Sequence, residues 1–114
     1  MKRSGPLLPL WRPSAGLVAA PLAWAAHHQA GSFLNFADCD RGDGMFVAAV
    51  GLAALAVAVA GGWLSWRAFG DAGSRTAQPT HRFIAVLGVM TAALLALTIA
   101  VQIMAGLVVP ACFR

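Results

Sequence analysis

Two long, strongly apolar stretches without a charged side chain constrain this chain more than any other feature. Residues 45–66 and 83–109 contain no Asp, Glu, Lys or Arg. Each exceeds the roughly 20 apolar residues that a helix needs to cross about 30 Å of hydrocarbon. The composition agrees, because 60% of the 114 residues are hydrophobic and 11% are charged. Such a chain is neither disordered nor an ordinary soluble domain, so we expect an integral membrane protein.

A third apolar stretch, residues 14–37, is long enough to span the membrane but is less apolar. The polar residues that interrupt it are His27, His28, Gln29, Ser32 and Asn35. An alternative interpretation is a signal peptide, with a basic start at 1–13 and an Ala-x-Ala cleavage site at 23–25. We expect an uncleaved span. The predicted fold class is therefore all-α, with three transmembrane helices.

Polar connections divide the chain into alternating segments. We predict a cytoplasmic lead (1–13), the first helix (14–37), an extracytoplasmic loop (38–44), the second helix (45–66), a cytoplasmic loop (67–82), the third helix (83–109) and an extracytoplasmic tail (110–114).

The orientation follows from the distribution of basic residues, which favour the cytoplasmic side. The side that carries the amino terminus has Lys2, Arg3, Arg12, Arg67, Arg75 and Arg82, whereas the other side has Arg41 and Arg114. We therefore expect a multi-pass protein of the bacterial inner membrane, with a cytoplasmic amino terminus and an extracytoplasmic carboxyl terminus.

The two cysteines fall at the same membrane surface in this topology. Cys39 follows the first span and Cys112 follows the third, both on the extracytoplasmic side, which is oxidising in bacteria. We predict a disulfide between them, which would close a loop of about 74 residues and contribute about 2–4 kcal/mol. The alternatives are two free thiols, or two metal or haem ligands completed by another chain.

Small and polar residues recur at helical spacing on the predicted spans. Small residues let helices approach closely in lipid, and polar residues there tend to face protein. The predicted packing positions are Ala54, Ala58, Gly62, Gly88, Ala92, Ala96 and Ala100. The predicted interhelical polar contacts are Ser32, Asn35, Thr98 and Gln102. These rows suit a packed bundle or a helix that docks on a larger partner.

His27 and His28 are the candidate cofactor residues. An imidazole at membrane depth can serve as a haem ligand, a copper ligand or a proton relay. The two side chains lie about 100° apart on a helix, so they do not serve one small site equally. His81 lies at the wrong depth for a second haem ligand, which leaves Met104. The plainer interpretation is hydrogen bonding within a helix interface, so we expect no cofactor and keep haem or copper as the alternative.

The sequence lacks the residue patterns that are typical of enzymes and of nucleic-acid-binding proteins. No carboxylate lies within a predicted span, and no Ser/His/Asp set shares one membrane side, so we expect no enzyme and identify no small-molecule substrate. The basic residues are spread along the chain, unlike a nucleic-acid-binding patch. A small transporter is disfavoured because no spans are broken in matching repeats. The expected partners are the lipid bilayer and a larger integral membrane complex.

Four short strings resemble a known group of proteins. They are PLAWAAHH at 21–28, Cys39, RFIAVLG at 82–88 and VVPAC at 108–112. These strings are similar to those of small three-span proteins that accompany bacterial haem–copper terminal oxidase genes. The resemblance implies an accessory or assembly-linked role beside a respiratory oxidase, and it supplies no catalytic residue to carry over.

Overall fold

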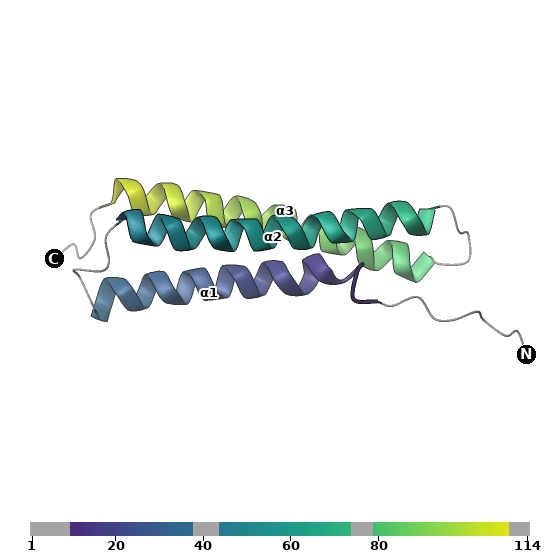
Figure 1. Ribbon diagram of the computed structural model, residues 1–114, viewed down its shortest axis with the longest axis horizontal. Coiled ribbons are helices and arrows are strands. Elements are labelled where there is room, and N and C mark those ends of the chain that lie inside the picture. The colour runs from purple at the N-terminus through teal and green to yellow at the C-terminus, as the bar shows by residue number, and fades with distance from the viewer. Residues whose placement is uncertain (1–9, 38–43, 74–78, 110–114) are drawn as a thin grey trace, which may run out of the picture.

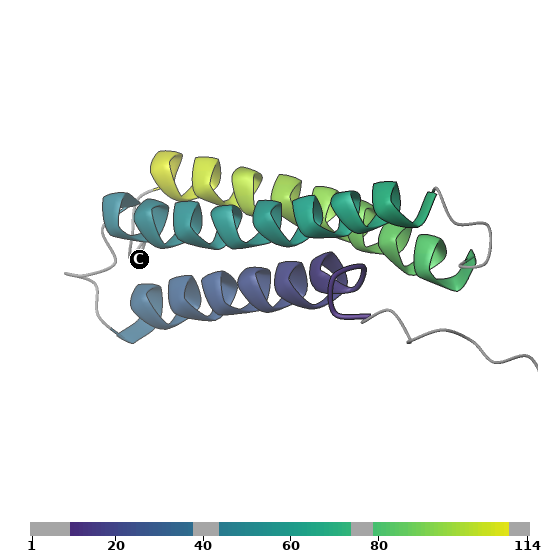
Figure 2. The same ribbon diagram turned by 45° about the vertical axis from the view of Figure 1, so that its right-hand side comes forward.

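The computed structural model describes residues 10–37, 44–73 and 79–109. The described part is all-helical, as predicted, and holds three helices and no strand: α1 (Ala15–Ala37), α2 (Gly44–Gly73) and α3 (Pro79–Val108). The helices α1 and α3 run in one direction and α2 runs in the other (Figure 1). The start of α1 and the end of α3 therefore lie at opposite ends of a three-helix bundle, and α1 stays alongside the other two helices in the turned view (Figure 2).

Two of the helices have the length and composition of membrane spans. Residues 44–71 of α2 and 79–108 of α3 are long and apolar enough to cross a bilayer. Only 17% and 22% of their most apolar stretches are buried within the structure, whereas an equally apolar helix of a soluble protein is mostly buried. The helix α1 does not reach the same apolarity, because His27, His28 and Gln29 follow one another in its second half.

The helices α2 and α3 extend beyond the predicted spans. We predicted a loop at 67–82, but α2 continues to Gly73 and α3 already begins at Pro79. A change from apolar to polar residues ends a membrane span without ending a helix, and a single Gly70 costs only about 1 kcal/mol of helix stability. Pro79 suits the first position of α3, where its missing amide has no intrahelical partner to lose.

The core of the bundle is built from small side chains. The buried apolar residues in the packed centre are Ala20, Ala23, Ala54, Ala58, Ala92 and Ile99. The predicted packing rows lie at these helix contacts: Ala54, Ala58, Gly88 and Ala92 are buried, and Gly62, Ala96 and Ala100 are half-buried. A Cβ atom added to Gly62 would stand 2.7 Å from the Ala92 Cβ atom. The small residues thus bring α2 and α3 into backbone-level contact, the arrangement that favours helix association in lipid.

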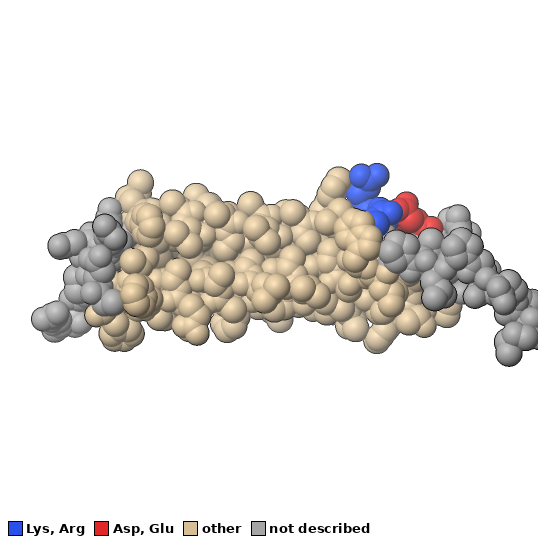
Figure 3. Space-filling model, turned by 60° about the horizontal axis from the view of Figure 1, so that its bottom comes forward, with Lys and Arg blue, Asp and Glu red and all other residues tan. Residues whose placement is uncertain are grey.

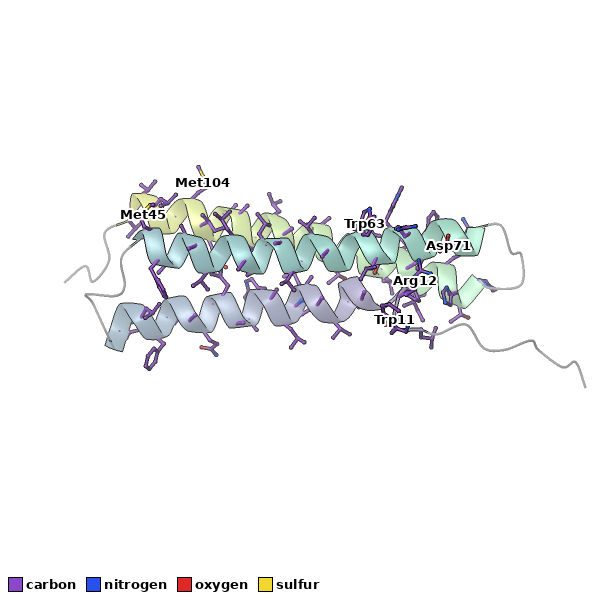
Figure 4. All side chains as sticks on the ribbon, in the orientation of Figure 1. Trp11, Arg12, Met45, Trp63, Asp71 and Met104 are labelled. Atoms are coloured by element: carbon purple, nitrogen blue, oxygen red, sulfur yellow. The ribbon has the colours of Figure 1, made fainter. Side chains whose placement is uncertain are left out.

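The outside of the bundle is apolar along most of its length. Large apolar side chains are exposed on every helix, among them Leu22, Phe33, Leu52, Leu94 and Leu97. On the face shown in Figure 3, the charged side chains gather at one end. Figure 4 places Trp11, Arg12, Trp63 and Asp71 together at that end, with Met45 and Met104 at the other. So large an apolar surface requires lipid or protein to cover it.

Candidate functional site

Three consecutive polar residues of α1 point in three directions. A helix turns about 100° per residue, so His27, His28 and Gln29 cannot share one environment. His27 is 4% exposed, whereas His28 and Gln29 are exposed. The other exposed polar groups of the described helices lie near helix ends, at Arg67, Asp71, Thr80 and Arg82. The middle of α1 is therefore where the bundle departs from an apolar surface.

His28 belongs to a polar group that joins α1 to α3. Its ring stacks on Trp24, with ring centroids 5.4 Å apart and an interplanar angle of 15°. Gln102 Nε2 of α3 lies 3.4 Å from His28 Nδ1, where the amide can donate to an unprotonated ring nitrogen. Trp24 Nε1 and Gln102 Oε1 are buried and have no hydrogen-bond partner among the described residues. We call Trp24, His28 and Gln102 the α1–α3 polar patch.

His27 lies in the interior, against a glycine of α2. A Cβ atom at Gly51 would stand 2.9 Å from His27 Nε2 and 2.5 Å from Ile103 Cγ1. Gly51 therefore leaves the room that the imidazole occupies between the helices. Neither ring nitrogen of His27 has a hydrogen-bond partner within the described part of the chain, which makes this ring a packing element with unused hydrogen-bonding capacity.

The structure does not bring the predicted cofactor residues into one site. His27 is interior, and His28 faces the α1–α3 surface. Met104 is 65% exposed and points away from α1 (Figure 4). Across residues 10–37, 44–73 and 79–109, no three His, Cys, Asp or Glu side chains come together. Haem or copper binding by either histidine stays the alternative interpretation, and Met104 does not supply the second ligand in this arrangement.

His81 is also remote from the histidine pair. It lies in the first turn of α3, seven residues before Gly88, which packs on Gly16 of α1. His27 lies eleven residues beyond Gly16 on the parallel helix. At 1.5 Å per residue, His81 and His27 are roughly 27 Å apart along the bundle, which agrees with the depth mismatch expected from the sequence.

The start of α1 is held by a serine of α2. Ser65 is fully buried, its hydroxyl donates to the Pro13 carbonyl at 2.9 Å, and it accepts the Gly16 amide at 2.9 Å. That amide belongs to the first turn of α1, where amides have no intrahelical partner. Gly88 of α3 packs on the same point, since a Cβ atom there would stand 2.7 Å from the Pro13 oxygen. We call these four residues the Ser65 junction.

Charged and aromatic side chains gather at the same end of the bundle. Arg12 and Asp71 form an ion pair at 3.0 Å, with side chains 35% and 66% exposed. An exposed pair of this kind contributes at most about 1 kcal/mol. Two guanidinium groups also lie over rings, Arg67 over Trp63 at 5.0 Å and Arg82 over Phe69 at 4.9 Å. This combination is typical of the interfacial region of a membrane protein.

The remaining predicted residues fall into two groups. Gln102 makes an interhelical contact, whereas Thr98 donates to the Leu94 carbonyl of its own helix at 2.9 Å, and Ser32 is half-buried. The Asn35 side chain, Cys39 and Cys112 lie outside the described residues. The disulfide therefore stays a prediction.

Comparison with known proteins gives no family for this chain. No protein-family model, no curated protein and no solved structure matches it. The fold and the site define a small all-helical bundle with two helices of membrane-spanning character and a polar patch at mid-length.

Proposed function

We propose that the chain is a three-span protein of the bacterial inner membrane, with a cytoplasmic amino terminus and an extracytoplasmic carboxyl terminus. Support for the third span comes from α1, whose 23 residues extend about 34 Å. It packs closely on both apolar helices: Gly16 contacts Gly88 of α3, and a Cβ atom at Gly61 of α2 would stand 2.9 Å from the Ala19 Cβ atom. A helix packed side by side with two spans lies at their depth.

In this membrane the protein serves as a non-catalytic accessory subunit, structural or assembly-linked, of a larger membrane complex. The observation that carries this proposal is the α1–α3 polar patch. His28 lies thirteen residues after Ala15, roughly 20 Å along the helix, and it is exposed. Polar side chains at such depth are costly against lipid and face protein instead. The patch thus suits a docking surface for another membrane subunit.

A respiratory terminal oxidase is the complex that we propose. This step depends on the resemblance of residues 21–28, 82–88 and 108–112 to small proteins that accompany haem–copper oxidase genes. The amide and the imidazole of the patch suit a partner helix that offers a hydrogen-bonding group at the same depth.

Affinity purification from native membranes tests the proposal. A tagged copy in mild detergent is expected to bring down larger membrane proteins, including oxidase subunits, identified by mass spectrometry. The double variant His28→Leu, Gln102→Leu removes the imidazole and the amide of the patch while keeping the helices apolar, and should lose the partner. The matched control is Thr98→Val, because that hydroxyl bonds within its own helix.

Two results would count against the proposal at different levels. A wild-type protein recovered alone, from membranes in which it is abundant, contradicts the accessory role. A larger partner without any oxidase subunit contradicts the respiratory assignment and leaves the accessory role standing.

A further inference from the structure

The outer face of α1 carries a regular seam of exposed side chains. Its members alternate in steps of four and three residues: Leu22, Ala26, Gln29, Phe33 and Phe36. This spacing is that of the core positions in a left-handed pair of helices. Leu22 is 64% exposed and Phe33 is 66% exposed, so the seam lies on the side of α1 that α2 and α3 do not cover. We call these five residues the α1 seam.

Gln29 is the one hydrogen-bonding residue of the α1 seam. No hydrogen bond joins its side chain to another residue of the described chain. Gln29 lies fourteen residues after Ala15 and eight before Ala37, roughly 21 Å and 12 Å along the helix. If α1 spans the membrane, both distances place the amide within the hydrocarbon, where lipid offers it no partner. The partner must come from another protein chain.

We infer that two copies of this chain pair through the α1 seam, with their Gln29 amides hydrogen-bonded to each other. The inference rests on the three-span topology proposed above. All copies insert in the same orientation, so a two-fold axis along the membrane normal brings each seam residue to its own counterpart at equal depth. An amide carries both donor and acceptor groups, and Gln29 therefore pairs with itself through two reciprocal bonds.

The neighbours of Gln29 fit the same arrangement. Ala26 is small enough to let the two backbones approach, and Leu22 and Phe33 supply apolar contacts above and below the amides. A foreign helix would need a polar group at matching depth and an apolar seam of matching register, whereas a second copy supplies both. His28 stays on the α1–α3 side, so the pairing leaves the polar patch open to a larger partner.

Oxidative cross-linking in native membranes tests the pairing. In a Cys39→Ser, Cys112→Ser background, Ala26→Cys places a thiol on the α1 seam and Leu94→Cys places a control thiol on α3, where Leu94 is 65% exposed. We expect a disulfide-linked dimer from Ala26→Cys and none from Leu94→Cys. Adding Gln29→Leu should weaken dimerisation about tenfold, measured by resonance energy transfer between labelled copies in vesicles. Gln29→Asn keeps the amide and should retain part of the dimer.

The outcomes separate this inference from the proposed function. If Ala26→Cys gives no dimer, or cross-links to a different protein, the pairing is wrong even when a tagged copy still brings down a larger complex. A dimer that is equally stable with Gln29→Leu also overturns it, since the amide is then not the contact. A Gln29-dependent dimer without any larger partner supports the pairing and contradicts the accessory role.

Discussion

Substitution of Gly88 by alanine tests the Ser65 junction, where all three helices meet. The added Cβ atom would stand 2.7 Å from the Pro13 carbonyl oxygen and 3.0 Å from the Ser65 Cβ atom, and it would also collide with the Ser65 hydroxyl. Pro13 and Ser65 are fully buried, and a backbone carbonyl cannot rotate away. Either the start of α1 moves away from α3, or the Ser65 side chain moves and its hydrogen bonds to the Pro13 carbonyl and the Gly16 amide break.

The expected cost follows from these contacts. Overpacking of this kind costs about 1–3 kcal/mol, and interhelical hydrogen bonds in membrane proteins contribute about 0.6 kcal/mol each. The higher helix propensity of alanine returns up to about 1 kcal/mol. We therefore expect Gly88→Ala to lower the free energy of unfolding by about 2 kcal/mol.

Unfolding in mixed micelles measures this effect. The purified protein in mild detergent is titrated with sodium dodecyl sulfate, and near-ultraviolet circular dichroism of its tryptophans follows the loss of packing. The control is Gly70→Ala, because a Cβ atom at Gly70 meets nothing within 4 Å. This control should be unchanged or slightly stabilised. If Gly88→Ala proves as stable as Gly70→Ala, the close contact at the junction is wrong.

Five further substitutions probe the other contacts. Ser65→Ala leaves the Gly16 amide without its acceptor and should destabilise the fold by about 1–3 kcal/mol in the same titration; an unchanged midpoint would argue against that bond. Gly51→Ala should destabilise by about 1–3 kcal/mol, and His27→Ala in the same chain should recover part of the loss, so strict additivity of the two changes would contradict their contact. Gln102→Leu alone should cost about 0.6 kcal/mol; a loss above about 2 kcal/mol would show a larger network than the α1–α3 polar patch. Asp71→Asn should change stability by less than about 1 kcal/mol and lose even that effect at high salt, which repeating the titration at two ionic strengths would check.

The helical class and the two most apolar helices, α2 and α3, were the part of the fold that the sequence predicted best. Uncharged apolar stretches have few alternatives to helices, because every backbone group must be paired internally in lipid. The helix ends were predicted less well. The charged Arg67 and Asp71 end the apolar stretch, but nothing in residues 67–73 prevents the helix from continuing to Gly73.

The types of residue at the site could be predicted from the sequence, but the directions in which their side chains point could not. Helical spacing showed that His27 and His28 diverge, but not that His27 faces inward, since this depends on the space that Gly51 leaves on a different helix. Ser65 looked like any serine near the end of a span, and its role appears only when Pro13 and Gly16 are brought to it. The signal that could have revealed these contacts was a glycine on one helix opposite a polar residue on another. Recognising that signal requires the register between the helices, which the sequence alone does not give.

The glycine contacts also explain why α1 can be less apolar than its neighbours. Its association with α2 and α3 depends on close approach at Gly16, Gly61 and Gly88 rather than on burial of large side chains. In lipid, such packing is the main attraction between helices. The polar residues of α1 are therefore compatible with a packed span, provided that protein covers those that face outward.

Membrane topology is the most direct test of the account. Reporter domains that fluoresce only in the cytoplasm, or are enzymatically active only outside it, can be fused to the first residue or to the last residue of separate copies that keep all 114 residues. Three crossings predict a cytoplasmic signal from the first fusion and an extracytoplasmic signal from the second. If both fusions report the same side of the membrane, α1 does not span with α2 and α3, and the depth assigned to His28 and Gln29 is wrong.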